Sequence, residues 1–327
     1  MIISRTPLRM SFVGGGSDLP SYYREHGGAV LSTAIDKYVY VSVNQKFDGG
    51  IRLAYSKTEE VVRLEDIEHR LLKSSFELLG IRGGVEITTT ADIPSRGTGL
   101  GSSSSFTVGL LQVMHAYLGR HISARALAEL SCDVEINRCG EPIGKQDQYA
   151  AAFGGLNLIE FNPDDSVHVN PVIMQRDVRN LIEDRIVVFY TGITRSASEI
   201  LKQQTADTAD SPTHKKALKR MVELAYSMRD ELSNGHVDSF GHLLDENWEL
   251  KKTLTKGIST AAIDGWYEAA KGAGAIGGKL LGAGSGGFLM FYAPVERHDD
   301  IANAVGLRRV RFRFEPEGSR ILFYNPR

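Results

Sequence analysis

Residues 94–105, with the sequence PSRGTGLGSSSS, combine a proline, three glycines and four serines in a pattern that could hold an anion. Gly97, Gly99 and Gly101 remove side chains from the turn, and the serines that follow begin an expected helix. Backbone N–H groups at a helix N-terminus, with serine hydroxyls and the positive end of the helix dipole, can bind phosphates. The alternative is an ordinary glycine-rich turn capped by serine. Three glycines running into four serines favour the phosphate loop.

Two acidic residues that lie twelve positions apart could carry the remaining chemistry of a phosphoryl transfer. Asp147 follows a loop and directly precedes an alanine-rich helical turn, where the helix dipole favours an ionised carboxylate. It could be no more than an N-cap, or it could orient an attacking hydroxyl and accept its proton. Glu135 lies beside Val134 on the preceding expected helix. It either pairs with an arginine or lysine or binds a hard cation such as Mg²⁺ through oxygen.

The other glycine-rich motifs do not form a conventional nucleotide site. The GK pair at 278–279 is followed by Leu280, where a P-loop needs Ser or Thr. The GxGxxG matches that begin at Gly272 and Gly282 do not open a dinucleotide-binding helix. The stretch GGKLLGAGSGGF is either a second loop that approaches a ligand closely or a tight packing of strand against helix. The nine histidines show no zinc-binding spacing.

Taken together, three segments resemble the three signature motifs of the GHMP kinases, the superfamily of galactokinase, homoserine kinase, mevalonate kinase and phosphomevalonate kinase. RMSFVGGGSDLP, PSRGTGLGSSSS and GAGSGG occur in the family order. The central loop resembles the family motif PxxxGLGSSA, with a fourth serine in place of alanine. The resemblance implies that this loop holds the phosphates of ATP, and that Ser103, among three candidate serines, binds Mg²⁺. The expected nucleotide-binding residues are Pro94, Gly97, Gly99, Leu100, Gly101, Ser102, Ser103 and Ser104.

The same resemblance implies roles for residues outside the loop. Glu135 and Asp147 keep the spacing found in the sugar kinases of the family, which implies a metal ligand and a catalytic base or hydroxyl-orienting group. Arg9 matches the arginine that steadies the charge of this aspartate. Asp18, which by itself could merely cap the following helix, matches the aspartate that binds sugar hydroxyls. Further substrate candidates are Gly15 and Gly16, where galactokinases carry Glu and His, and Gly284 and Ser285 in the third motif.

Within the superfamily, the runs TPLRMSFVGGGSDLPSYY, GKQDQYAAAFGG and YTGITRSASEIL most closely resemble the D-glycero-D-manno-heptose 7-phosphate kinases. Those enzymes phosphorylate the anomeric hydroxyl of a sugar phosphate, so the site would need cations beyond those that serve ATP. Lys145, Arg195 and Lys202 are the candidates for the distal phosphate. A kinase for an unphosphorylated sugar such as fucose is one alternative. A catalytically silent sugar and ATP sensor is another, although the presence of both acids argues against it.

The elements that must position these residues are strands mixed irregularly with helices, which predicts an α+β fold. The resemblance implies the two-domain GHMP kinase fold. Its N-terminal domain, residues 1–178, would resemble domain 2 of ribosomal protein S5, and its C-terminal domain, residues 179–327, would be ferredoxin-like. The polar stretch 203–214 is the best candidate for a mobile loop, as an exposed linker rather than a flap over the substrate.

Hydrophobic patterning predicts the individual elements. Ser123 is the expected N-cap of a helix. Helices are expected at 65–79, 213–234, 236–255 and 259–272, and strands at 84–90, 287–292, 308–314 and 320–324.

Composition narrows the class of protein. A net charge of −2 lacks the positive surface that nucleic-acid binding needs, so the expected partner is a small sugar phosphate. No signal peptide or long apolar run is present, which predicts a cytoplasmic protein without membrane association. Cys132 and Cys139 are too few for a disulfide framework. The motifs do not fix the oligomeric state, and a homodimer is one option.

Overall fold

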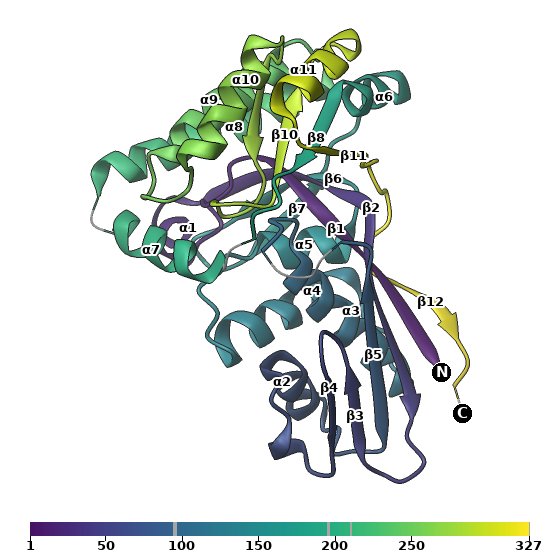
Figure 1. The fold of residues 1–327 in the computed structure, drawn as a ribbon. Coiled ribbons are helices and arrows are strands. Elements are labelled where there is room, and N and C mark those ends of the chain that lie inside the picture. Colours follow the sequence, from purple (N-terminus) through teal and green to yellow (C-terminus); the bar gives the residue numbers. More distant parts are fainter. Residues whose placement is uncertain (94–96, 195–196, 210, 327) are drawn as a thin grey trace.

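The computed structural model describes residues 1–93, 97–194, 197–209 and 211–326. Two lobes are visible in Figure 1, and each is built around its own sheet. The lower lobe contains the first part of the chain and the upper lobe most of the second part. The predicted α+β class is confirmed, because helices and largely antiparallel strands alternate without a regular βαβ repeat.

The first sheet has the strand order β12-β1-β2-β5-β3-β4, and β6 and β7 extend it from the other half of β2. The 18-residue strand β2 makes this branching possible. Its first residues pair with β6, its last residues pair with β5, and β1 lies along its other edge. The strands are β1 (Ile2–Val13), β2 (Gly28–Gln45), β3 (Ile51–Ala54), β4 (Thr58–Val61), β5 (Val85–Ala91), β6 (Leu156–Phe161), β7 (Val167–Pro171) and β12 (Arg320–Tyr324).

Helices that cover this sheet carry the expected acidic and serine-rich motifs. α3 (Ser102–Tyr117) contacts both β1 and β2 and is buried over most of its length. Ser123 caps the next helix as predicted, since its Oγ accepts a hydrogen bond of 3.3 Å from the backbone N of Ala126. The other helical segments of this lobe are α1 (Pro20–His26), η1 (Leu64–Asp66), α2 (Arg70–Leu79), α4 (Ala124–Cys132), the π-helix η2 (Asp133–Arg138) and α5 (Gln146–Phe153).

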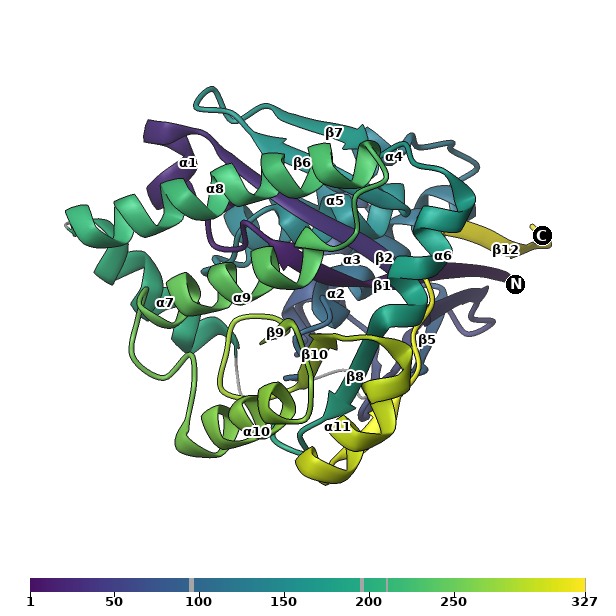
Figure 2. The ribbon, with the colours of Figure 1, turned by 90° about the horizontal axis from the view of Figure 1, so that it is seen from above.

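The second sheet has the order β11-β8-β10-β9, and all of its pairings are antiparallel. Its strands and helices follow the β-α-β-β-α-β pattern of ferredoxin-like domains, as expected. Seen from above in Figure 2, α8 and α9 run alongside each other over the long strands of the first sheet. The elements are α6 (Arg176–Arg185), β8 (Ile186–Tyr190), α7 (Ala197–Ala209), α8 (Pro212–Ser233), α9 (Ser239–Lys252), α10 (Ala261–Gly272), β9 (Gly277–Leu280), β10 (Phe288–Tyr292), η3 (Val295–Arg297), α11 (His298–Val305) and β11 (Arg308–Val310).

The polar stretch 203–214 is not the predicted mobile loop. α7 continues to Ala209 and α8 begins at Pro212. The sequence is polar, but Gln204 and Thr208 lie one helical turn apart, and each is only 1% exposed. The polar composition thus conceals a helix with a buried polar face. Two other predictions need smaller corrections, because the 65–79 segment is divided into η1 and α2 and the 308–314 strand ends at Val310.

The last part of the chain returns to the first sheet. Phe314 pairs with Ile35, and β12 pairs with the beginning of β1. The expected domain boundary between residues 178 and 179 falls inside α6. Residues far beyond this boundary also contribute a strand, β12, to the sheet of the first lobe. One hydrophobic core runs through both lobes, and in it the Phe12 and Phe240 rings lie 5.2 Å apart. The two lobes are therefore packed against each other through a shared hydrophobic core.

In the part of the chain that the structure describes, no helix has the length and apolar character needed to cross a membrane. Cys132 and Cys139 are both buried and unbonded, in agreement with the prediction that they form no disulfide framework.

Candidate active site

A cavity of about 890 Å³ opens between the two lobes. The first lobe contributes the end of β1, the glycine-rich turn after it, the phosphate loop and the start of α5, and the second lobe contributes α7, α9 and the loop after β9. Most of the residues predicted from the sequence are thus brought together. Those that line the cavity are Arg9, Gly15, Gly16, Asp18, Gly97, Gly99, Gly101, Ser102, Ser103, Ser104 and Asp147.

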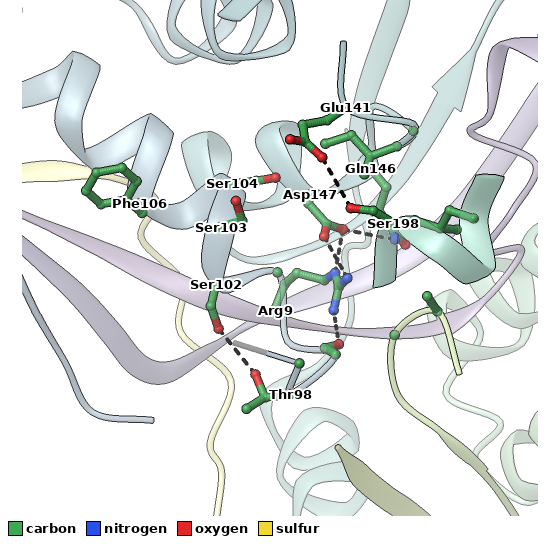
Figure 3. A pocket seen from close by; sticks show the side chains of 18 of the residues that line it. Arg9, Thr98, Ser102, Ser103, Ser104, Phe106, Glu141, Gln146, Asp147 and Ser198 are labelled. Atoms are coloured by element: carbon green, nitrogen blue, oxygen red, sulfur yellow. Dashed lines mark hydrogen bonds and ion pairs between the residues drawn. The ribbon is translucent and has the colours of Figure 1, made fainter. Parts of the chain in front are cut away.

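Arg9 and Asp147 form the centre of the site. The Arg9 Nε and Nη2 atoms donate to the two carboxylate oxygens of Asp147 at 2.7 and 2.8 Å. The third guanidinium nitrogen, Nη1, donates to the carbonyl oxygen of Gly99 at 2.6 Å. Figure 3 shows the guanidinium between the aspartate and the phosphate loop. This fork fixes the orientation of Asp147 in the first turn of α5 and ties it to the loop expected to hold phosphates.

The phosphate loop lies against the third glycine-rich motif, backbone against backbone. A Cβ atom at Gly99 would clash with the carbonyl oxygen of Leu281, and one at Gly282 would clash with the Gly99 backbone. Glycine is required because these two chain segments, from different lobes, approach too closely for side chains. The tight packing of strand against helix, one alternative for the third motif, is present, because a Cβ atom at Gly277 in β9 would clash with the carbonyl oxygen of Gly241 in α9. Gly282 lines the cavity, and the other alternative, a close approach to a ligand, stays a prediction.

Glu135 lies beneath the N-terminus of α3 and is 1% exposed. Ser104 Oγ donates to its Oε2 at 2.7 Å, and Thr107 Oγ1 donates to its Oε1 at 3.0 Å. Gln148 Nε2 and Ser103 Oγ complete the shell at 2.5 and 3.4 Å. Burial raises the pKa of Glu135 to about 7, against the lowering effect of these hydrogen bonds. Among the described residues, no salt bridge joins Glu135 to an arginine or lysine, which was one alternative left open by the sequence.

Glu135 reaches this position from an irregular helix. The sequence predicts an ordinary helix here, but residues Asp133–Arg138 form a π-helix that directly continues α4. A π-helical turn inserts an extra residue and rotates the side chains that follow it, and such turns are frequent at functional sites. Sequence periodicity gives no signal for this insertion.

Asp18 is not the cap of the following helix. The N-cap of α1 is Leu19, and no side chain caps it. Asp18 instead accepts hydrogen bonds from the backbone N of Gly16 at 3.0 Å and of Gln146 at 3.2 Å. Burial, and then the charge of Asp147, raise its pKa above the ordinary value, while the backbone donors lower it. The carboxylate thus joins the turn after β1 to the start of α5, inside the cavity.

Lys251 is a charged group of the site that the sequence analysis missed. It comes from the end of α9, lines the cavity, and its Nζ donates to the carbonyl oxygen of Gly282. Burial and the nearby charge of Arg9 lower its pKa to about 8, and the carboxylates of Asp18 and Asp147 act against this shift. Lysines in helices are usually solvated, so only the packing of α9 against the other lobe could have identified this one.

An apolar end of the cavity was also missed. Its wall includes Tyr55, His69, Leu71, Ile93 and Phe106, which come from four separate segments. The His69 ring lies 4.7 Å from the Tyr55 ring and 5.4 Å from the Phe106 ring, centroid to centroid. A planar aromatic base fits such a surface. No local motif could reveal a wall assembled from such distant segments.

Other predicted residues lie outside the cavity wall. Lys145 donates to Asp165 Oδ1 at 2.9 Å and lies over the Tyr23 ring, and Lys202 is exposed on α7. Gly284 and Ser285 pack against the 257–258 turn, and Leu100 is buried with its carbonyl oxygen accepting from the Arg9 backbone N. Pro94 and Arg195 fall outside the described residues.

The donors around the phosphate loop fit a hard cation only in part. Ser103 and Glu135 offer the oxygen ligands that Mg²⁺ prefers, and the Ser103 side chain is exposed to the cavity. Among the described residues, however, no group of three or more His, Cys, Asp or Glu could hold a metal ion. A cation here would take its other ligands from nucleotide phosphates and water, which is how Mg²⁺ is usually bound with a nucleotide.

Comparison with known proteins identifies the family. A model described as the GHMP kinases N terminal domain matches residues 66–155, and one described as GHMP kinases C terminal matches residues 228–307. Together they match more than half of the chain. The chain belongs to the GHMP kinases and is an ATP-dependent phosphotransferase.

Individual relatives agree with this assignment. The D-glycero-alpha-D-manno-heptose 7-phosphate kinase of Campylobacter jejuni is 29% identical over 320 residues, covering 91% of both chains. The bifunctional fucokinase/GDP-fucose pyrophosphorylase of Arabidopsis thaliana is 29% identical over 88% of this chain but only 29% of its own length. Among solved structures, a D-glycero-D-manno-heptose 1-phosphate kinase from Bacteroides thetaiotaomicron superimposes with a TM-score of 0.82 at 28% identity, covering 99% of this chain and 100% of that one.

Proposed function

We propose that this kinase transfers the γ-phosphoryl group of ATP to the anomeric hydroxyl of a D-glycero-D-manno-heptose 7-phosphate, giving the 1,7-bisphosphate. The observation that carries the proposal is the bidentate Arg9–Asp147 pair, which faces the same cavity as the phosphate loop. A fixed carboxylate beside a phosphate cradle is the arrangement that phosphoryl transfer to a hydroxyl requires.

Asp147 acts on the acceptor hydroxyl. Its Oδ1 accepts hydrogen bonds from Arg9 and Gln146, whereas its Oδ2 accepts one from Arg9 and keeps a lone pair for the substrate. The hydroxyl oxygen forms a bond to the γ-phosphorus while the bond from this phosphorus to the β–γ bridging oxygen breaks. The hydroxyl proton passes to Asp147, and ADP leaves. Arg9 holds the carboxylate in position for this attack, so its role is orientation as well as charge.

The phosphates of ATP lie along the N-terminus of α3 in this proposal. Backbone N–H groups and the hydroxyls of Ser102 and Ser103 face the cavity there, and the helix dipole favours negative charge. The base occupies the apolar end beside Tyr55 and Phe106. Mg²⁺, held by Ser103 and Glu135 with the nucleotide, would neutralise charge on the transferring phosphoryl group. Lys251 adds a positive charge from the other lobe.

The choice of acceptor comes from the comparisons and the motifs. It rests on the names of two relatives, a heptose 7-phosphate kinase and a heptose 1-phosphate kinase that match 91% and 99% of this chain, and on the motifs around Asp18 and Asp147. A fucose-type acceptor is the second candidate, since a fucokinase is about as similar in sequence identity. The lysines predicted to bind a distal phosphate do not distinguish the two acceptors. Lys145 is hydrogen-bonded to Asp165, and Lys202 does not line the cavity.

The test is ADP release with Mg²⁺ and ATP against D-glycero-D-manno-heptose 7-phosphate, D-mannose, L-fucose and D-galactose, with an acceptor-free control. Turnover confined to the heptose phosphate supports the whole proposal. Turnover on a free sugar keeps the kinase chemistry and replaces the acceptor. If none of these sugars is phosphorylated, the proposed acceptor and its fucose-type alternative are both wrong.

A further inference from the structure

Three buried polar atoms without a hydrogen-bond partner line one part of the cavity. They are Ser11 Oγ, Gln146 Oε1 and Gln204 Nε2. The three residues are 4%, 7% and 1% exposed. A buried donor or acceptor that lacks a partner is costly, so sites of this kind are usually completed by a ligand or by water. All three residues line the cavity, so a ligand that binds there lies beside them.

The three atoms gather around the glycine-rich turn that follows β1. A Cβ atom at Gly15 would lie 3.5 Å from Ser11 Oγ, and one at Gly16 would lie 2.5 Å from Gln204 Nε2. Gly16 and Gln146 donate their backbone N–H groups to the same Asp18 carboxylate. Ser11, Gln146 and Gln204 therefore lie around the turn that carries Asp18, and we refer to these three residues as the acceptor wall.

Gln204 alone in the acceptor wall comes from the second lobe. The missing side chain at Gly16 leaves the space in which its amide lies, since any larger residue there would displace it. α7 is held in this position by Ser198, whose Oγ donates to Glu141 Oε2 at 3.2 Å (Figure 3). Glu141 belongs to the loop that leads into α5 and Asp147. The helix is thus fastened to the segment that carries the proposed base.

The chemistry of the free atoms specifies the kind of ligand. Gln204 Nε2 can only donate, and Gln146 Oε1 can only accept, because the Gln146 Nε2 atom already donates to Asp147 Oδ1 at 3.2 Å. A fully ionised phosphate can accept a hydrogen bond from Gln204 Nε2, but it has no hydrogen to donate to Gln146 Oε1. Hydroxyl groups both donate and accept, and Asp18 and Ser11 also suit them. A polyhydroxylated carbon chain or ring meets all of these requirements.

We propose that the acceptor wall binds the hydroxyl-bearing part of the acceptor sugar, and that Gln204 is a specificity-determining residue which donates a hydrogen bond to one of its hydroxyls. This inference rests on the proposed function and deepens it, because it identifies which side chains recognise the acceptor. It also places any distal phosphate of the acceptor away from these three residues.

The test compares Gln204→Leu with Gln203→Leu. The second variant makes the same chemical change at the neighbouring position of α7, where the side chain is exposed and bonds Asp207 at 2.6 Å. Steady-state kinetics are measured with whichever of the four sugars the wild type phosphorylates. We expect Gln204→Leu to lower kcat/KM for the acceptor by about 10- to 100-fold, the cost of an unpaired buried group. The KM for ATP should stay within about twofold, and Gln203→Leu should resemble the wild type.

Loss of discrimination provides a second readout. Monodeoxy analogues of the phosphorylated sugar are assayed with both variants and with the wild type. One analogue should be a poor substrate for the wild type but no worse than the parent sugar for Gln204→Leu, because the hydrogen bond is absent in both cases. An unchanged acceptor kcat/KM in Gln204→Leu, or equal losses for acceptor and ATP, would overturn the inference while leaving the kinase assignment intact.

The inference remains testable if the proposed function fails. When no sugar of the panel is phosphorylated, the thermal unfolding midpoint of the wild type and of Gln204→Leu is measured with each sugar. A sugar that raises the midpoint of the wild type but not of Gln204→Leu supports the acceptor wall without kinase activity. If no sugar raises it in the wild type, or one raises it equally in the variant, the acceptor wall does not bind sugars through Gln204.

Discussion

The reaction centre, formed by Arg9, Glu135 and Asp147, and the acceptor wall differ in how their polar atoms are satisfied. In the reaction centre the carboxylates of Glu135 and Asp147 are bonded to protein donors before any ligand binds. In the acceptor wall, each of the three residues has a buried polar atom without a partner. The two regions adjoin, since Gln146 of the acceptor wall directly precedes Asp147 of the reaction centre and donates a hydrogen bond to it.

This difference indicates that the reaction centre and the acceptor wall have different functions. Groups that act on the transferring phosphoryl are held in place by the protein, which keeps the reorganisation needed during reaction small. Groups that recognise the acceptor are left to be satisfied by it, so a wrong acceptor leaves them unpaired and binds poorly. Substitutions in the reaction centre should therefore lower turnover, whereas substitutions in the acceptor wall should weaken selection of the substrate.

The largest effect is expected for Asp147→Asn. The amide keeps the shape of the side chain but cannot accept the hydroxyl proton, and it loses the charge that Arg9 balances. Turnover should fall about 10²-fold or more, while ATP binding, measured by titration calorimetry, stays close to that of the wild type. Full activity in this variant would end the assignment of Asp147 as the base.

Glu135→Gln should weaken Mg²⁺ binding without disturbing the hydrogen bonds around residue 135. Without the carboxylate, the Mg²⁺ concentration that gives half-maximal activity should rise by about tenfold or more. Ser104 and Gln148 can still donate to the amide oxygen, so the shell around residue 135 should survive. An unchanged Mg²⁺ requirement would show that Glu135 is not a metal ligand.

The same variant should alter how stability depends on pH. The pKa of Glu135 is about 7 in the folded protein against an ordinary 4.5, so between these values the folded state binds more protons than the unfolded state. The free energy of unfolding, without ligands, should therefore fall by on the order of 3 kcal/mol as the pH rises through this window. Glu135→Gln should lose that fall, which urea unfolding at pH 5 and pH 7.5 would reveal.

Lys251 extends the reaction centre from the other lobe, and an intermediate effect is expected there. Lys251→Met should lower kcat/KM for ATP by about tenfold, the scale of one charged contact. Because the pKa of Lys251 is lowered to about 8, the wild-type kcat/KM should decline as the pH rises through 8. In Lys251→Arg this decline should disappear, since arginine remains protonated. An identical alkaline limb in wild type and Lys251→Arg would assign the decline to another group.

The smallest effect is expected for Lys145→Ala. The Lys145 amine is paired with Asp165 and lies outside the cavity wall, so the KM for the acceptor should change by no more than about twofold. Asp165→Ala, which frees this amine, is the matched control. A tenfold or larger rise in the acceptor KM for Lys145→Ala alone would instead restore Lys145 as a residue that holds a distal phosphate.

The reaction centre could be predicted from the sequence because its residues occur in compact motifs. Gly97, Gly99 and the serines that follow are contiguous, and the spacing of Glu135 and Asp147 lies within one stretch of the chain. The fold class and most helices followed from hydrophobic periodicity. The irregular π-helix that carries Glu135 did not, because an inserted turn does not change the pattern of residue types.

The acceptor wall could not be predicted for a physical reason. Gln204 lies in a polar stretch that suggests a loop, and it becomes a site residue only because α7 packs over Gly16. Lys251 likewise looks like an ordinary lysine near a helix end. Both enter the cavity from the second lobe, so their roles depend on how the lobes pack together. Tertiary contacts of this kind leave no periodic trace in the sequence.

The pairing of β12 with β1 has a consequence for synthesis on the ribosome. Ile2 pairs with Tyr324, which lies far later in the chain, so one edge of β1 stays open until residues 320–324 have been translated. An open strand edge invites pairing with other chains. Pairing between positions so distant in sequence is also slow. We expect the nascent first lobe to be most prone to aggregate before residues 320–324 emerge, and chaperones to matter most during that interval.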